Sequence, residues 1–288
     1  MRQNTLLKAV ATVLLFAVGV GSASAVTLKE IKDRGYARVA VANEIPYGYV
    51  GAEGKPQGPG PLVAQKVLEE LGVTDIQWSV TAFGSLIPGL KANRFDMTAA
   101  EMAILPQRCD QVIYSAPNTT YGEGLLVKAG NPKDLHGYGD FAKMADAKVA
   151  IMAGADQLDM LHELGVPDSQ MVTIQNNADA ISTVATGRAD AYAATGLTAA
   201  KLAEKSDKVK LADPFHDPVI KGEAVRSWGG FTFNKDSADF RDAFNEKLKE
   251  FKKTDEWKSI LSKYGFSTTD INQSFEKTTS ELCSAMSS

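Results

Sequence analysis

The sequence is poor in the residues that most metal sites and many hydrolytic active sites need. It has 2 cysteines and 3 histidines among 288 residues. The histidines, His136, His162 and His216, are scattered along the chain, and none is spaced with a cysteine as zinc ligands are. There is no G-x-S-x-G motif and no histidine paired with a recognisable nucleophile. These absences argue against a metalloenzyme or a serine hydrolase, and we expect neither a metal nor a cofactor.

Long apolar runs are also scarce, and the one that stands out is Ala9–Val20 near the N-terminus. This run is too short to span a bilayer, follows a basic segment and precedes Ala23-Ser24-Ala25, an A-x-A cleavage pattern. We therefore expect residues 1–25 to be a cleaved signal peptide and the mature chain to begin at Val26. No cysteine lies near the cleavage point, which argues against a lipid anchor. The mature protein is expected to be soluble and periplasmic.

An excess of positive charge is likewise absent. The formal net charge is −4, and the loss of Arg2 and Lys8 with the signal peptide moves it to −6. A mildly acidic surface argues against nucleic acid and anionic lipid as partners. The apolar fraction of 44% is that of an ordinary globular protein.

The two cysteines, Cys109 and Cys283, would lie in an oxidising compartment if the chain is exported. An even number of cysteines in such a chain favours a disulfide, and the alternative is two free thiols. A disulfide would join the C-terminal tail to a turn that carries Arg108.

Strand-like and helix-like segments alternate along the chain, which predicts mostly parallel sheets covered by helices. The expected strands are Tyr36–Val41, Ile76–Val80, Met97–Ala100, Gly124–Val127, Lys148–Met152, Met171–Ile174, Ala191–Ala194, Lys208–Leu211 and Ser227–Phe233. The expected helices are Leu62–Leu71, Leu86–Ala92, Asp156–Leu164, Ala178–Gly187, Thr198–Ala203, Ala238–Lys253 and Asp255–Tyr264.

The alternation begins afresh after the break Ala129-Gly130-Asn131-Pro132, so we expect two α/β lobes. Residues 26–130 and 225–288 are assigned to lobe 1, and residues 131–224 to lobe 2. Two chain crossings between two lobes would form a hinge that closes around a ligand.

The most informative stretch is Met97–Ser115, MTAAEMAILPQRCDQVIYS. A buried strand leads to Pro106, which fits the first position of a helical turn, and that turn carries Arg108. A guanidinium offers a planar fork of donors that suits a carboxylate or a phosphate. We therefore expect Arg108 to hold an anionic group in the cleft at the strand ends.

This stretch and the C-terminal segment WGGFTFNKDSADFRDAFNEKLKEFKKTDEWKSILSKYGF resemble the type 3 bacterial solute-binding proteins. The resemblance covers nearly all of the mature chain. It implies an α/β fold of two Rossmann-like lobes joined by a two-strand hinge, the periplasmic binding protein type II-like fold. It also implies a small ligand, a membrane permease of an ABC importer as partner, and a role for Arg108 on the ligand's carboxylate. We expect a monomer.

Three positions depart from the pattern that amino-acid binders of this family usually show. Ala103 stands where a threonine is common, Gly154-Ala155 replaces a Gly-Thr pair, and Thr195 replaces the aspartate that takes the α-ammonium. A buried ammonium without a carboxylate partner is costly. The resemblance therefore argues against an ordinary α-amino acid.

Glu44 stands where amino-acid binders commonly have an aromatic wall, and Tyr47 and Phe83 lie in neighbouring strand-end loops. A carboxylate, two rings and an arginine suit a zwitterion with a delocalised positive charge. This set is similar to that of the ectoine- and hydroxyectoine-binding members of the family. Because Ala103 lacks the third ring expected there, Met102 or Trp228 could complete the cage.

Other classes of function remain open from the sequence. The ligand could be an amino acid or a derivative of one. The same fold also hosts dehydratases and cell-wall lytic domains, although no paired catalytic acid and base is visible. A sensory domain is a further alternative, but no transmembrane helix or signalling domain follows in this sequence.

Overall fold

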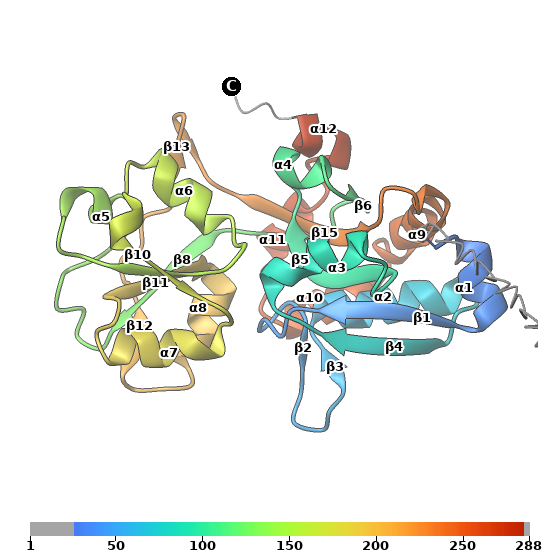
Figure 1. Ribbon diagram of the computed structural model, residues 1–288, viewed down its shortest axis with the longest axis horizontal. Coiled ribbons are helices and arrows are strands. Elements are labelled where there is room, and N and C mark those ends of the chain that lie inside the picture. Colours follow the sequence, from blue (N-terminus) through green and yellow to red (C-terminus); the bar gives the residue numbers. More distant parts are fainter. Residues whose placement is uncertain (1–25, 285–288) are drawn as a thin grey trace, which may run out of the picture.

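The computed structural model describes residues 26–284, which form two α/β lobes side by side (Figure 1). The expected signal peptide lies outside the described residues. The sheet of lobe 1 has the strand order β4-β1-β5-β15-β6, with β7 also paired to β15. Its strands are β1 (Tyr36–Val41), β4 (Asp75–Val80), β5 (Met97–Ala103), β6 (Ile113–Tyr114), β7 (Thr119–Tyr121) and β15 (Ser227–Phe233). β1 runs parallel to β4 and β5, whereas β15 runs antiparallel to β5.

Helices cover both faces of this sheet. They are α1 (Leu28–Arg34), α2 (Pro59–Glu70), η1 (Phe83–Ser85), α3 (Leu86–Lys91), α4 (Pro106–Cys109), α9 (Ala238–Phe251), α10 (Asp255–Lys263), α11 (Thr268–Gln273) and α12 (Thr279–Ser284). Every residue of β5 is buried, as expected for a central strand covered on both sides. On α9 the stripe predicted by helical spacing is buried in the core: Phe240, Phe244, Leu248 and Phe251. A short hairpin, β2 (Tyr49–Val50) and β3 (Pro56–Gln57), projects from this lobe.

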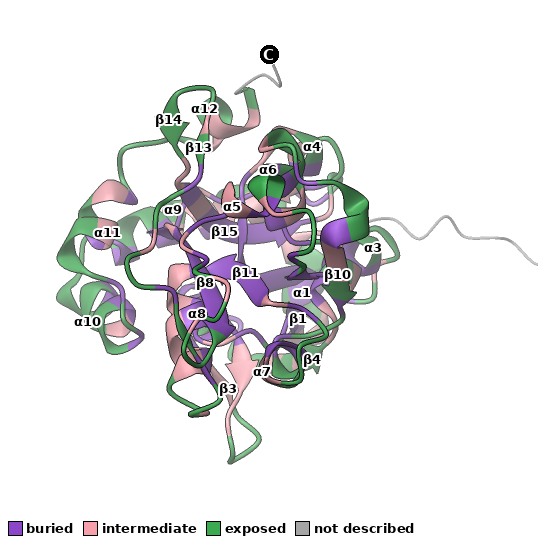
Figure 2. Ribbon diagram, turned by 90° about the vertical axis from the view of Figure 1, so that its left-hand side faces the viewer, coloured by how far each residue is buried: buried purple, intermediate pink, exposed green. Residues whose placement is uncertain are grey.

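Lobe 2 has its own sheet with the strand order β10-β9-β11-β8-β12. The strands are β8 (Glu123–Lys128), β9 (Val149–Met152), β10 (Met171–Ile174), β11 (Ala191–Thr195) and β12 (Val209–Leu211). The helices are α5 (Asp140–Lys143), α6 (Gln157–Glu163), η2 (Asp168–Gln170), α7 (Ala178–Ala185) and α8 (Gly196–Ala203), and a hairpin is formed by β13 (Val219–Ile220) and β14 (Glu223–Ala224). Figure 2 shows the buried strands at the centre of the molecule and the exposed helix faces around them.

Two chain segments cross between the lobes, one entering β8 and one entering β15 (Figure 1). The prediction that lobe 2 begins at residue 131 is wrong. The earlier strand β8 already belongs to the second sheet, where it pairs with β11 and β12. Only Gly122 separates β7 in the first sheet from β8 in the second. The second crossing lies between β14 and β15. The first crossing was misplaced because a hinge strand passes between sheets without the Asn-Pro break that marks a loop.

A disulfide joins Cys109 in α4 to Cys283 in α12, as the sequence predicts. It fixes the C-terminal helix of the described chain against the turn that carries Arg108. Among residues 26–284, no helix is long and apolar enough to cross a membrane. The same residues contain no group of three or more His, Cys, Asp or Glu side chains that could hold a metal ion.

Candidate functional site

A small cavity of about 20 Å³ lies at the interface of the two lobes. Its walls come from loops and helix starts that follow the strands, where ligands bind in open α/β sheets. Lobe 1 contributes Glu44, Tyr47, Phe83, Ala100, Glu101, Ala103 and Tyr121, and lobe 2 contributes Met152, Ala155, Asp156, Gln157 and Thr195. The cavity therefore exists only while the two lobes are together.

The structure brings together most of the residues expected in the site. Glu44, Tyr47, Phe83, Ala103, Ala155 and Thr195 line the cavity. Four other predicted residues do not line it: Met102, Arg108, Gly154 and Trp228. Met102 packs instead into a hydrophobic cluster with Leu86, Leu90 and Tyr114. The indole of Trp228 donates to the carbonyl of Gln273 at 3.0 Å and lines a separate groove.

The third ring at the cavity is Tyr121, which the sequence analysis missed. Its ring centroid lies 5.0 Å from that of Tyr47 at an interplanar angle of 60°. The Tyr121 hydroxyl donates to the carbonyl of Glu101 at 2.9 Å. Tyr121 lies at the end of β7, a short strand that carries little sequence signal.

Arg108 is buried beside the cavity, behind the residues that line it. One guanidinium nitrogen donates to the carbonyl of Ala103 at 3.0 Å, and the other terminal nitrogen donates to the carbonyl of Gly154 at 2.9 Å. The guanidinium carbon lies 5.5 Å from the centroid of the Phe83 ring. Because Ala103 belongs to lobe 1 and Gly154 to lobe 2, Arg108 joins the lobes behind the cavity.

Glu44 is buried, and this burial raises the pKa of its carboxyl to about 7. Its Oε1 accepts a hydrogen bond from the Thr198 hydroxyl at 3.1 Å, across the interface of the lobes. The hydroxyl of Tyr47 makes a second bond between the lobes, donating to Thr195 Oγ1 at 2.9 Å. Thr195 also caps α8 by accepting from the Thr198 amide at 3.2 Å. Thr195 is therefore a cap and an acceptor for a tyrosine, with no charge to offer a ligand.

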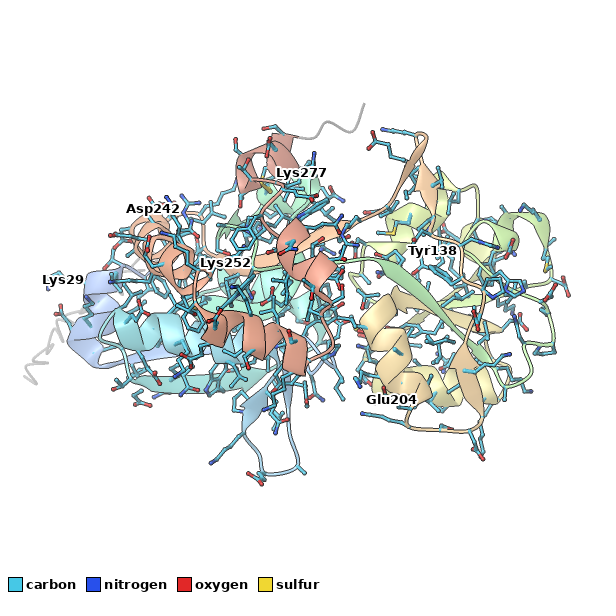
Figure 3. The ribbon with its side chains drawn as sticks, turned by 180° about the vertical axis from the view of Figure 1, so that it is seen from behind. Lys29, Tyr138, Glu204, Asp242, Lys252 and Lys277 are labelled. Carbon is cyan, nitrogen blue, oxygen red and sulfur yellow. A yellow bond between two sulfur atoms is a disulfide. The ribbon has the colours of Figure 1, made fainter. Side chains whose placement is uncertain are left out.

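Two further carboxyls are buried in this region: Glu101 lines the cavity and Glu123 does not. Glu101, with a left-handed φ of 49°, accepts from Asn118 at 2.7 Å and from Thr119 at 2.8 Å. Glu123 accepts from Gln157 at 2.7 Å and from Tyr138 at 3.1 Å; Tyr138 lies within lobe 2 (Figure 3). Burial raises the pKa of Glu101 to about 7 and that of Glu123 to about 8.

Asp156 is a cavity residue that sequence reasoning treated only as the start of a helix. It is the N-cap residue of α6, four residues after the end of β9, and its carboxylate lies 3.9 Å from an Arg108 nitrogen. The available signal was its place after the Gly154-Ala155 pair, at a strand end that faces the cleft. The cavity thus presents carboxyl groups from both lobes and three aromatic rings, with Arg108 buried beside it. This composition suits the capture of a small polar ligand that carries positive charge.

The chain matches the family model "Bacterial extracellular solute-binding proteins, family 3" over residues 37–268, and it belongs to that family. A relative from Sinorhizobium fredii (strain NBRC 101917 / NGR234), a probable amino-acid ABC transporter periplasmic-binding protein (y4tE), is 59% identical over 277 residues. That alignment covers 96% of this chain and 92% of the relative.

Solved structures agree with this assignment. EhuB in complex with hydroxyectoine is similar with a TM-score of 0.81 and 34% identity, covering 90% of this chain and 98% of EhuB. The ancestral amino acid-binding protein AncCDT-1, a precursor of cyclohexadienyl dehydratase, has a TM-score of 0.72 and 28% identity, covering 82% of this chain and 98% of that chain.

The protein is therefore a solute-binding protein of an ABC importer and not an enzyme. It belongs to a family of periplasmic binding proteins, with a small molecule as ligand and a membrane permease as partner.

Proposed function

We propose that the protein captures a compact zwitterion with a delocalised positive charge, such as ectoine or hydroxyectoine, for import. The observation that supports this most is the cavity lined by Glu44 and the rings of Tyr47, Phe83 and Tyr121, with the Arg108 guanidinium 5.5 Å from the Phe83 ring. Aromatic faces attract a delocalised cation, and Glu44 can accept from its N–H groups. Arg108 retains donors for the ligand's carboxylate beyond the two that bond to backbone carbonyls.

An α-amino acid or a derivative is the second candidate. The Sinorhizobium fredii relative, at 59% identity, is described as a probable amino-acid binder. Against this candidate, Thr195 stands where the carboxylate partner of an α-ammonium is common, and its hydroxyl is already engaged by Tyr47.

Calorimetry with the purified protein tests the ligand class directly. Ectoine, hydroxyectoine, glycine betaine and a panel of α-amino acids should be titrated under one set of conditions. Ectoine or hydroxyectoine is expected to bind at least about tenfold more tightly than any standard amino acid, a difference of about 1.4 kcal/mol. Tighter binding of glutamine, arginine or another amino acid would exclude the ectoine assignment and favour the second candidate.

We also infer that residues 1–25 are removed on export and that the mature protein acts as a monomer in the periplasm. The apolar run and the A-x-A pattern support the first inference. N-terminal sequencing of periplasmic material is expected to give Val26 as the first residue. Light scattering is expected to give the mass of one chain, and a stable dimer would contradict the second inference.

A further inference from the structure

We propose that Asp156 determines which ligands this cavity accepts: from lobe 2 it holds the ligand's positive charge and it repels anionic ligands. This inference rests on the proposed binding of a charged small molecule between the lobes. It goes beyond that function by naming the residue that selects the charge. Under this inference, the ligands that the cavity accepts include small zwitterions and cations in general.

The first argument is where the Asp156 side chain lies. Asp156 occupies the N-cap position of α6, where an aspartate usually accepts from the first amides of the helix. Its side chain makes no such bond. The residue lines the interlobe cavity instead, and its side chain is only 11% exposed to solvent.

The second argument is that Asp156 is only loosely held by the protein. The distance from its Oδ1 to the nearer Arg108 nitrogen is 3.9 Å, which is too long for a hydrogen bond. Its Oδ2 lies 3.4 Å from the Ser227 hydroxyl, a weak contact. The shorter bonds of Arg108 go to backbone carbonyls. The Asp156 carboxylate therefore has acceptor capacity left for a ligand.

The third argument is the balance of charge around the cavity. Glu44 and Glu101 face it from lobe 1 and Asp156 from lobe 2, and the Arg108 guanidinium lies 3.9 Å from Asp156. The charge of Asp156 also raises the pKa values of Glu44 and Glu123, so its field reaches across the site. A positively charged ligand would be neutralised from both lobes on closure. An anionic ligand would place a further negative charge beside the Asp156 carboxylate and the partly ionised Glu44.

This arrangement also accounts for the uncharged Thr195. The negative charge absent at the end of β11 is supplied by Asp156 at the start of α6, in the same lobe and on the same cavity. The site thus keeps an anionic partner for the ligand but presents it from a different strand end.

The test compares Asp156→Asn with Asp159→Asn. Asp159 lies on the same helix, is exposed, does not line the cavity and bonds to Gln107 at 3.1 Å across the lobes. The control therefore removes an equal charge and an interlobe bond without changing the cavity. Ectoine, glutamine and glutamate are titrated calorimetrically into the wild type and both variants, with circular dichroism to check folding.

Asp156→Asn is expected to weaken the tightest of the three ligands by about tenfold or more. It is also expected to bring the affinity for glutamate closer to that for glutamine. Asp159→Asn should change each affinity by less than about threefold. Unchanged or tighter binding of the best ligand by Asp156→Asn would overturn the proposal and would show that Asp156 merely competes for Arg108.

The outcomes separate this proposal from the ligand assignment. If glutamine binds best and Asp156→Asn still weakens it, the ectoine assignment fails and the role of Asp156 stands. If ectoine binds best and Asp156→Asn leaves the affinity for ectoine unchanged, the ectoine assignment stands and the role of Asp156 fails. If none of the three ligands binds the wild type, both proposals are contradicted.

Discussion

Arg108 contacts both lobes and also lies close to the proposed ligand site. It bonds to one backbone carbonyl from each lobe, and it lies beside the cavity in which we place the ligand's carboxylate. A lysine in its place would keep the charge but could not bond to Ala103, Gly154 and a carboxylate in the same plane.

Arg108→Ala is therefore expected to reduce ligand affinity by about 2–5 kcal/mol, because the ligand's carboxylate is left buried and unpaired. Arg108→Lys should recover part of this loss. Calorimetry measures both, and thermal unfolding checks that each variant is folded. A folded Arg108→Ala protein that binds within about threefold of the wild type would rule out the role given to Arg108.

The buried carboxyl of Glu44 predicts a pH dependence of stability. Its pKa is about 7 in the folded protein, against 4.5 for the same group in water. A raised carboxyl pKa stabilises the folded state fully below the unfolded value, and this contribution is lost as the pH rises through 7. Glu44→Gln removes the titration while keeping the shape. The variant should gain thermal stability relative to the wild type between pH 5 and pH 8, by up to about 3 kcal/mol.

The measurement is the difference in melting temperature between wild type and Glu44→Gln, both without ligand, across this pH range. Using the difference cancels the titration of Glu101, Glu123 and the surface groups. A difference that does not change with pH would show that Glu44 does not titrate in this window.

At the scale of the elements, the disulfide between α4 and α12 fixes the turn that carries Arg108. Its cysteines are separated by 174 residues in sequence, and cross-links that close long loops restrict the unfolded chain strongly. Cys283→Ser is expected to lower stability by about 2–4 kcal/mol. Ligand affinity should fall by less than tenfold, since Arg108 keeps its bonds to Ala103 and Gly154.

Denaturant unfolding of the wild type with and without dithiothreitol provides the matched control. Reduction should lower the stability of the wild type to that of Cys283→Ser and leave the variant unchanged. A variant as stable as the oxidised wild type would show that the disulfide does not stabilise the fold.

The elements also show how far the sequence predicts this protein. Helical spacing located α9 and its buried stripe, and β1 has the predicted bounds, because burial imposes a regular pattern on helices and strands. β7 was missed because three residues carry no period, and Tyr121 was missed with it. The site prediction failed at Met102 for a related reason. The regular alternation of a strand fails in β5, where Glu101 has a φ of 49° and the neighbours Ala100 and Glu101 both line the cavity.

At the scale of the whole molecule, the two lobes approach closely at a pair of glycines. A Cβ on Gly84 of lobe 1 would lie 3.1 Å from the carbonyl oxygen of Ala153 in lobe 2, which is a tight contact. Gly154, the next residue, has a φ of 81° and faces Gly84. The absence of a side chain at Gly84 therefore permits this closed arrangement.

Gly84→Val is expected to oppose closure without disturbing either lobe. It should reduce ligand affinity by about tenfold or more while leaving the stability of the ligand-free protein within about 0.5 kcal/mol. Gly139→Val is the matched control, because a Cβ there meets nothing within 4 Å and its φ is −67°.

Small-angle X-ray scattering reports the closure itself. Saturating ligand is expected to reduce the radius of gyration of the wild type and of Gly139→Val, and to reduce that of Gly84→Val less. Equal compaction of all three proteins would show that the glycine contact does not limit closure. An unchanged radius in the wild type would contradict a ligand-driven hinge.

The position of the cavity between the lobes has a consequence for the speed of delivery. A ligand enclosed by residues from both lobes cannot leave while they stay together, so its escape is no faster than their separation. Each contact across the interface, such as Tyr47 with Thr195, lengthens the residence time of the captured solute. Tighter capture from dilute surroundings therefore slows the hand-over to the permease. Substitutions that only strengthen the interface should raise affinity and lower the maximal rate of import together.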